Sequence, residues 1–346
     1  MTELPLPASA ADGGPLLELR GVTTELLIGG QHHAVVRDVS LAIDRGEVVG
    51  LVGESGSGKS MTARTILRLL PRGARTGGEV VFDGLNLLAE PTRALRAVRA
   101  RRISMIFQDP RAHIDPLFTA GDHLAEGLRV HGGLSRQDAQ QRGLELLADV
   151  GIADGKRVMR AYPGELSGGM LQRVMIAGAL AGQPELLIAD EPTTALDVTI
   201  QAEIVAIFDG LRRERDLAIL FITHDLELAS AICDRVVVMY AGRIMEEQAT
   251  EGLFAAPAHP YTVGLLAARP ALETRSDRLA VIPGRPPTPV ETPEGCPFHP
   301  RCAVAVDACR AEIPPLRRGG PGASSACRRV DEIRPELAAL HVPARA

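Results

Sequence analysis

The residues whose types and spacing could do chemistry begin with the run GESGSGKS, which spans Gly53–Ser60. It fits the pattern G-x-x-x-x-G-K-[ST], in which backbone N–H groups of a glycine-rich turn surround a phosphate and the lysine neutralises phosphate oxygens. An apolar segment precedes the run and a helical pattern follows it, which disfavours a chance glycine-rich turn. The sequence therefore predicts a nucleoside triphosphate site formed by Gly53, Glu54, Ser55, Gly56, Ser57, Gly58, Lys59, Ser60 and Met61.

A second run, LLIADE at Leu186–Glu191, is an apolar strand pattern that ends in two carboxylates. Such a pair alone could equally be a helix cap. Downstream of a phosphate-binding loop, it predicts that Asp190 and Ser60 hold Mg²⁺ and that Glu191 polarises an attacking water. Glu191 and Lys59 are therefore predicted to be catalytic.

These residues need strands and helices to position them. Strand-like runs at residues 103–107, 186–190, 218–223 and 236–242 are mostly separated by helical patterns, which predicts an α/β fold with crossover connections.

The domain organisation follows from changes in pattern along the chain. Residues 110–163 show only helical patterns, which predicts a helical subdomain inserted in an ATPase domain of residues 15–258. Residues 1–14 are predicted to be a disordered leader. The proline-rich composition after about His259 predicts a separate, small and loop-rich extension at 259–346.

Composition excludes several classes of function. A net charge of −5, no Trp and 3% aromatic residues argue against a nucleic-acid partner. The N-terminus lacks the features of a signal peptide, and the apolar runs are shorter than the roughly 18–20 residues that cross a bilayer. We therefore expect a soluble chain in a reducing compartment, where cysteines bind a metal rather than form disulfides.

Further motifs complete a set. LSGGM at Leu166–Met170 lies between the two runs above, while Gln108 lies in IFQDP, Asp197 in TALD and His224 in FITHD. In this order the motifs resemble those of the ABC-type ATPases, a P-loop NTPase family. The resemblance implies that Gln108 contacts the nucleotide and Mg²⁺, that Asp197 belongs to the nucleotide site, and that His224 is a catalytic switch.

The LSGGM run stands at the start of a helical pattern, where Ser167, Gly168 and Gly169 present backbone donors and the positive end of a helix dipole. The resemblance implies that these donors meet the γ-phosphate of ATP bound to a second ABC ATPase subunit, preferably a paralogue. A monomer would then be nearly inactive. One departure from the family is that TELLIGGQHHAV offers no aromatic ring to stack on adenine, which leaves that contact unassigned.

Motifs in the C-terminal extension indicate a particular branch of the ABC-type ATPases. HPYTVGLLAARP (259–270), IPGRPPTP (282–289) and CPFHPRC (296–302) resemble the C-terminal extension of dipeptide and oligopeptide permease ATPases. This resemblance implies an ATP-hydrolysing motor subunit of an ABC importer for dipeptides or oligopeptides. Nickel, glutathione and oligosaccharides remain alternative substrates.

The implied partners are two integral membrane permease subunits and an extracytoplasmic solute-binding protein, with this chain peripheral on the cytoplasmic face of the cell membrane. A soluble ABC ATPase of DNA repair, translation or iron–sulfur assembly is the alternative. It is disfavoured because the chain has a single cassette and a permease-type tail.

Four of the five cysteines lie in the tail: Cys296, Cys302, Cys309 and Cys327. Their spacing, C-x5-C-x6-C-x17-C, is too open for the paired C-x2-C knuckles of common zinc sites. Four thiolates can still hold either Zn²⁺ or an iron–sulfur cluster. The resemblance favours a structural [4Fe–4S] cluster, with Zn²⁺ as the alternative, and leaves His299 outside the ligand set.

Overall fold

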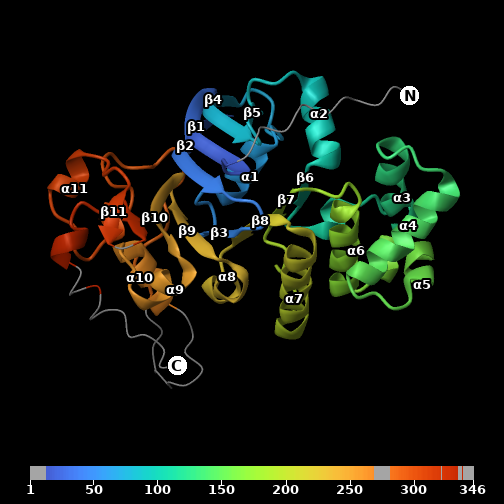
Figure 1. Ribbon diagram of the computed structural model, residues 1–346. Helices are drawn as coiled ribbons and strands as arrows, with labels where there is room; N and C mark the ends of the chain where they lie inside the picture. The colour runs from blue at the N-terminus through green and yellow to red at the C-terminus, as the bar shows by residue number, and fades with distance from the viewer. Residues whose placement is uncertain (1–12, 269–280, 321, 334–336, 338–346) are drawn as a thin grey trace. The chain divides into compact units, whose positions relative to one another are not determined.

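The computed structural model describes residues 13–268, 281–320, 322–333 and 337 (Figure 1). The predicted leader therefore lies almost wholly outside the described residues. The chain divides into two compact units, of which unit 1 comprises residues 1–17, 42–48 and 81–222, and unit 2 comprises residues 18–41, 49–80 and 223–346.

Unit 1 contains a parallel sheet in which β7 (Leu186–Asp190) lies between β6 (Ile103–Ile106) and β8 (Ala218–Thr223). Every residue of β7 and β8 is buried, as the continuous apolar runs predict. The helices that alternate with these strands are α2 (Thr92–Arg101), α6 (Gly168–Leu180) and α7 (Val198–Arg215). The predicted α/β fold is confirmed.

Residues 110–163, all of them described, contain helices and no strand. The elements are η1 (Pro110–Ala112), α3 (Ala120–Val130), α4 (Arg136–Asp149), α5 (Gly155–Arg160) and, at the end, η2 (Pro163–Glu165). Each of the three α-helices has an N-cap residue whose side chain accepts a hydrogen bond from the first turn: Thr119 for α3, Ser135 for α4 and Asp154 for α5. Helices α3 and α4 pack on each other and on α6. The predicted helical character of residues 110–163 is therefore present, and their being a separate subdomain stays a prediction.

Unit 2 contains the strands β3, β9, β10, β12 and β11, and most of a four-stranded sheet with the order β2-β1-β4-β5. β3 (Val48–Val52) pairs in parallel with β9 (Arg235–Tyr240), and β10, β12 and β11 follow as antiparallel strands. The bounds of the remaining strands are β1 (Leu17–Ile28), β2 (Gln31–Ile43), β4 (Arg75–Phe82), β5 (Leu85–Asn86), β10 (Arg243–Ala249), β11 (Arg317–Gly320) and β12 (Ala323–Ser325). The helices are α1 (Lys59–Ile66), α8 (Leu226–Ile232), α9 (Thr250–Ala255) and α10 (Pro260–Ala267).

In its described part, the C-terminal extension contains helix α10 (Pro260–Ala267) and the strands β11 and β12. Its other elements are the short turns η3 (His299–Arg301) and α11 (Ala308–Ala311). Strand β12 adds to the sheet beside β10, with Glu246 opposite Ser325. The extension thus belongs to the same compact unit as the residues just before α1, and the predicted boundary at 258/259 stays a prediction.

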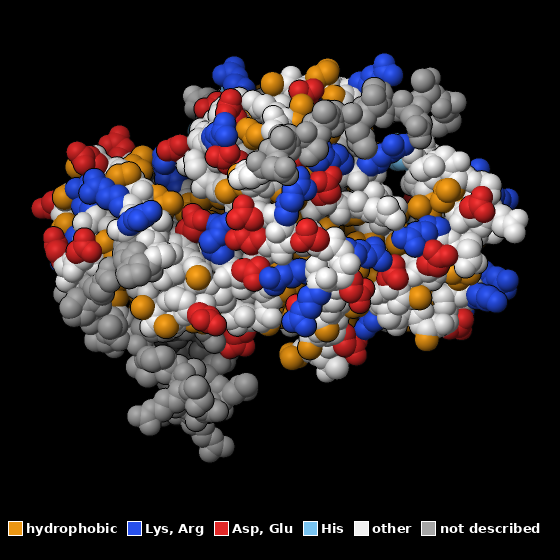
Figure 2. All heavy atoms as spheres, in the orientation of Figure 1, with side chains coloured by type: hydrophobic (Ala, Val, Ile, Leu, Met, Phe, Trp, Pro, Cys, Tyr) orange, Lys and Arg blue, Asp and Glu red, His pale blue; other side chains and the backbone are white. Residues whose placement is uncertain are grey.

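Figure 2 shows acidic and basic side chains interspersed over the displayed face, in keeping with a net charge of only −5. No helix in the described part of the chain is both long enough and apolar enough to span a membrane.

Candidate functional site

The predicted site residues are divided between the units. Unit 1 holds Gln108, Ser167, Gly168, Gly169, Asp190, Glu191 and Asp197. Unit 2 holds Gly53–Ser60, which we call the phosphate loop, and also Met61, His224, Cys296, Cys302, Cys309 and Cys327.

The phosphate loop joins the fully buried strand β3 to helix α1. The side chain of Lys59 is buried, and its Nζ donates hydrogen bonds to the carbonyls of Gly53 (2.7 Å) and Glu54 (3.0 Å). The hydroxyl of Ser57 is buried and has no hydrogen-bond partner among the described residues. A buried cation and an unpaired hydroxyl beside a helix N-terminus are groups that a phosphate can engage.

Two glycines of the phosphate loop are required by space as well as by conformation. Gly53 has φ 152°, and a Cβ there would lie 2.2 Å from the backbone oxygen of Met239. Gly58 has φ 106°, and a Cβ there would lie 2.8 Å from the backbone oxygen of Val35. A larger residue at either position would collide with a neighbouring strand, so both motif glycines have a structural reason apart from phosphate binding.

The carboxylate of Glu191 lies just beyond the carboxyl end of β7. Because Ile106 of β6 lies opposite Ala189 of β7, Gln108 and Glu191 leave the sheet at the same level. The Nε2 of Gln108 donates to Oε2 of Glu191 at 2.9 Å, and Thr194 Oγ1 donates to the same oxygen at 2.8 Å. The structure therefore brings together two predicted residues and adds Thr194, whose only signal in the sequence is its place three residues after Glu191.

The LSGGM segment starts helix α6. Ser167 is the N-cap and accepts a hydrogen bond from the N–H of Met170 at 3.3 Å. Ser167 and Gly168 are exposed, whereas Gly169 is buried. A Cβ at Gly169 would not fit, because it would lie 2.8 Å from Cγ2 of Ile200. The N-terminus of this 13-residue helix is thus open to an anion from outside the unit.

The two remaining motif residues lie at helix starts. Asp197 is the N-cap of α7 and accepts a hydrogen bond from the N–H of Ile200 at 3.0 Å. His224 is exposed and lies directly between β8 and Asp225, which caps α8. The cap explains an acidic residue at 197 without a ligand, so a nucleotide contact by Asp197 stays a prediction.

The four cysteines of the extension line one small cavity. Their segments are joined by a hydrogen bond from the N–H of Cys296 to the carbonyl of Cys309, at 2.8 Å. None of the four forms a disulfide, and neither does Cys233, which is buried beside Gly50. The Nδ1 of His299 lies 2.9 Å from the carbonyl oxygen of Cys296 and forms a hydrogen bond with it.

Burial raises the pKa of Cys296 and that of Cys327 to about 11, and it also raises the pKa of Cys302. These thiols are therefore protonated at neutral pH unless a cation replaces the protons. Four sulfur donors in one cavity match the chemistry of Zn²⁺ or an iron–sulfur cluster. Among the described residues, however, no group of three or more His, Cys, Asp or Glu side chains is already arranged around a metal position.

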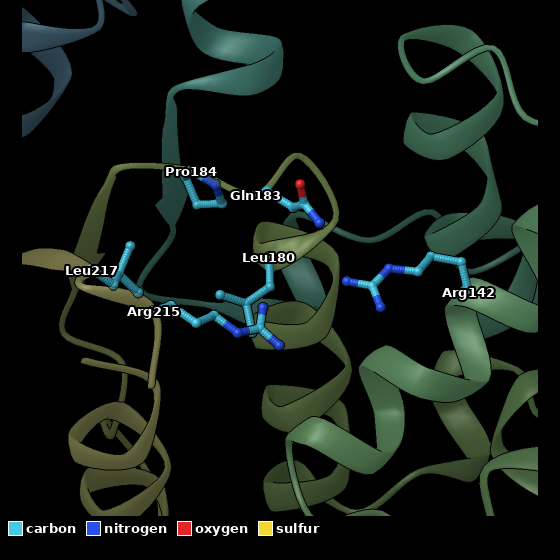
Figure 3. A pocket seen from close by; sticks show the side chains of 6 residues that line it. All are labelled: Arg142, Leu180, Gln183, Pro184, Arg215 and Leu217. Atoms are coloured by element: carbon cyan, nitrogen blue, oxygen red, sulfur yellow. The ribbon is translucent and has the colours of Figure 1, made fainter. Parts of the chain in front are cut away.

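A hollow in unit 1 contains none of the predicted residues. It is lined by Arg142, Leu180, Gln183, Pro184, Arg215 and Leu217 (Figure 3). Its two arginines are paired with acidic side chains, Arg142 with Glu145 at 2.8 Å and Arg215 with Asp149 at 2.5 Å. Their charges are offset, so this hollow does not compete with the phosphate loop as an anion site.

Comparisons with known proteins give consistent results. Residues 36–194 match the family described as ABC transporter, and residues 245–309 match the family described as oligopeptide/dipeptide transporter, C-terminal region. The chain is 44% identical over 333 residues to the oligopeptide transport ATP-binding protein OppD of Salmonella typhimurium, covering 96% of this chain and 98% of that protein. It is 48% identical to the probable peptide ABC transporter ATP-binding protein y4tR of Sinorhizobium fredii, covering 92% and 96%.

Solved structures agree. The ATP-binding cassette MJ0796, in a dimeric post-hydrolysis state bound to ADP and Pi, matches with a TM-score of 0.61 and 30% identity. That match covers 68% of this chain and 98% of the cassette.

Proposed function

This chain belongs to the ABC transporter family, in its oligopeptide and dipeptide branch, and we propose from this premise that it is the ATP-hydrolysing motor subunit of a peptide importer. The observation that carries the proposal is the presence, in one chain, of the phosphate loop and the peptide-transporter C-terminal region. ATP binding and hydrolysis would move membrane permease subunits and thereby transport a dipeptide or oligopeptide.

The chemistry assigned to the site is phosphoryl transfer to water. Lys59 would neutralise the β- and γ-phosphate oxygens, while Ser60, Gln108 and Asp190 would hold Mg²⁺. Glu191 would accept a hydrogen bond from the attacking water as the bond between the γ-phosphorus and its leaving oxygen breaks. The hydrogen bonds from Gln108 and Thr194 support this role, because they fix the orientation of the Glu191 carboxylate. His224 would act as the switch that senses the γ-phosphate.

A second ABC ATPase subunit, preferably a paralogue, would complete each nucleotide site. The exposed start of α6 at Ser167 and Gly168 supports this assignment, since it offers backbone donors that are accessible to a partner. The start of α7 is also open, with Val198 81% exposed beside Asp197.

The helical subdomain is the surface that we assign to the two integral membrane permease subunits. Helices α3, α4 and α5 line a hollow of about 1020 Å³. Leu117 and Phe118, just before α3, are 79% and 57% exposed, and Phe118 is one of the residues that line the hollow, so two large apolar side chains are available to a partner there. Docking there would place the chain peripherally on the cytoplasmic face of the membrane, with a solute-binding protein on the opposite side.

For the tail we propose that Cys296, Cys302, Cys309 and Cys327 hold a structural [4Fe–4S] cluster, with Zn²⁺ as the alternative. Their shared cavity and donor chemistry support it. Protein prepared without oxygen should be brown, with absorbance near about 400 nm and about four irons per chain. Colourless protein with one zinc per chain, from iron-replete cells, would exclude the cluster and favour zinc.

The motor function is tested by reconstitution. The chain should co-purify with two permeases and a second ATPase, and its low ATP turnover alone should rise by at least about tenfold in that complex because each site is then whole. Stimulation by peptide, rather than by nickel, glutathione or oligosaccharide, identifies the solute. Full turnover by the isolated chain, independent of its concentration, would instead favour a soluble ABC ATPase of DNA repair, translation or iron–sulfur assembly.

A further inference from the structure

The second residue of the phosphate loop is bound by the C-terminal extension. Arg301 forms a two-pronged ion pair with Glu54, with Nη1 2.6 Å from Oε2 and Nη2 3.0 Å from Oε1. Both residues belong to unit 2, although they lie 247 positions apart in the chain. The side chain of Arg301 is only 6% exposed and that of Glu54 is 25% exposed, so water screens this pair far less than a surface pair.

A second contact holds the backbone of the same residue. The N–H of Glu54 donates to the hydroxyl oxygen of Tyr261 at 2.9 Å. Tyr261 is fully buried on α10, and its ring packs on those of Tyr240 (4.7 Å between centroids) and Phe298 (5.2 Å). Side chain and backbone of Glu54 are thus both fixed by residues that follow the ATPase motifs in the chain.

The carboxylate of Glu54 adds a negative charge to the loop that is predicted to bind ATP. A carboxylate in a loop that binds a triphosphate repels it unless a cation offsets the charge. Arg301 supplies that cation, and its Nε donates to the carbonyl of Pro283 at 2.8 Å, which fixes its direction. The backbone of Glu54 also holds Lys59, whose Nζ donates to the Glu54 carbonyl at 3.0 Å. Moving Glu54 therefore disturbs the loop and its lysine together.

Arg301 is in turn positioned by residues 296–327, which carry the four cysteines and which we call the four-cysteine segment. It is the last residue of η3 and directly precedes Cys302. Its N–H donates to the carbonyl of Phe298 at 3.0 Å, and the N–H of His299 donates to the carbonyl of Cys296 at 3.0 Å. The turn between Cys296 and Cys302 consequently sets where the guanidinium lies.

We propose that Arg301 is a positioning residue for ATP binding, which neutralises and orients Glu54 and so makes the ATP affinity of the phosphate loop depend on the fold of the four-cysteine segment. This inference rests on the proposed function in one respect, namely that the loop binds ATP. It assigns the extension a role in the nucleotide site of its own chain.

The test compares the two ends of the ion pair in the full-length chain, by calorimetric titration with MgATP. Arg301→Met should raise the Kd about tenfold, because it leaves the Glu54 carboxylate uncompensated beside the phosphates. Glu54→Gln should raise the Kd less than Arg301→Met does, because the neutral amide still accepts from Arg301 and no charge is left uncompensated. The double variant Glu54→Gln/Arg301→Met should recover to within about threefold of wild type, since the stranded charge is gone.

Kinetics of the assembled transporter give a second readout. Arg301→Met should raise KM for ATP about tenfold and change kcat by less than about threefold, as expected for a residue that acts on binding. Arg301→Lys should lie between wild type and Arg301→Met, because lysine restores the charge without the two-pronged geometry. The matched control is Arg285→Met, which breaks a two-pronged pair with Glu291 in the same extension, at an exposed place, and should leave both values unchanged.

The outcomes separate the two claims. If Lys59→Ala abolishes ATP binding while folded Arg301→Met keeps the wild-type Kd, this inference is overturned and the proposed function stands. Equal weakening by Glu54→Gln and Arg301→Met, without recovery in the double variant, would also overturn it, since that pattern marks a purely structural pair. Should Arg301→Met fail to fold, Arg301→Lys and the double variant decide. Wild-type protein that does not bind ATP would overturn the proposed function itself.

Discussion

The phosphate loop and the four-cysteine segment offer opposite kinds of groups to the ligands that we predict for them. The loop offers backbone N–H groups and one buried lysine from eight consecutive residues, already held by a strand, a helix and two glycines without space for a side chain. The cysteine segment offers side chains from separate turns, and burial raises the pKa of its thiols, to about 11 at Cys296. A site made of backbone can be ready before its ligand arrives, whereas a site made of buried thiols needs the metal to replace its protons.

The two regions are nevertheless neighbours in one unit, because Arg301 and Tyr261 of the extension contact Glu54 of the loop. The difference between them therefore becomes testable: a change on the ATP side should leave the cysteine site intact, and a change at the cysteines should reach the ATP side only through Glu54.

The largest expected effect is on hydrolysis. Glu191→Gln should lower kcat of the assembled transporter by about two to four orders of magnitude, because the amide cannot polarise water, while ATP binding and metal content stay unchanged. The measurement is steady-state phosphate release alongside MgATP titration. A kcat near wild type would remove Glu191 from the catalytic role.

The next effect concerns the place where the extension joins the sheet. Glu246 on β10 is fully buried and accepts hydrogen bonds from the N–H of Ala258 at 2.7 Å and from Nε2 of Gln248 at 3.2 Å. Burial raises its pKa from 4.5 to about 7. The folded state thus holds a proton that the unfolded state releases, so stability is lost as pH rises from about 4.5 to about 7.

Glu246→Gln should remove this dependence. Relative to the variant, wild type should lose up to about 3 kcal/mol of unfolding free energy between pH 4.5 and 7, the value of that pKa difference. Comparing the two proteins cancels the opposite contribution of His259, whose pKa burial lowers to about 3. Chemical denaturation at several pH values measures it, and parallel curves for the two proteins would contradict the buried-acid explanation.

The smallest expected effect is that of a change in the four-cysteine segment on ATP binding by the phosphate loop. Cys302→Ser should remove the bound metal or cluster and raise the Kd for MgATP by about three- to tenfold, because the adjacent Arg301 loses its fixed position. Cys233→Ser is the control, since this thiol lies beside Gly50, outside the cavity of the other four. A Cys302→Ser protein without metal but with the wild-type Kd would show that the two regions are independent.

Several features of this protein are determined by short segments of its sequence. The phosphate loop, the buried strands at 186–190 and 218–223, and the helical character of residues 110–163 depend on local backbone preference and on apolar periodicity, so each could be predicted and each is present. The resemblance to peptide-permease ATPases likewise rests on contiguous motifs, and the comparisons confirm it.

Contacts between segments that are distant in the sequence could be found only in the tertiary structure. Gln108 reaches Glu191 only because β6 and β7 are parallel neighbours with Ile106 opposite Ala189, a register that no local pattern specifies. Arg301 reaches Glu54 because β12 joins β10 and the extension folds back within unit 2. Sequence motifs record which groups are available, whereas strand order and register, set by burial and hydrogen bonding across the whole sheet, decide which of those groups meet.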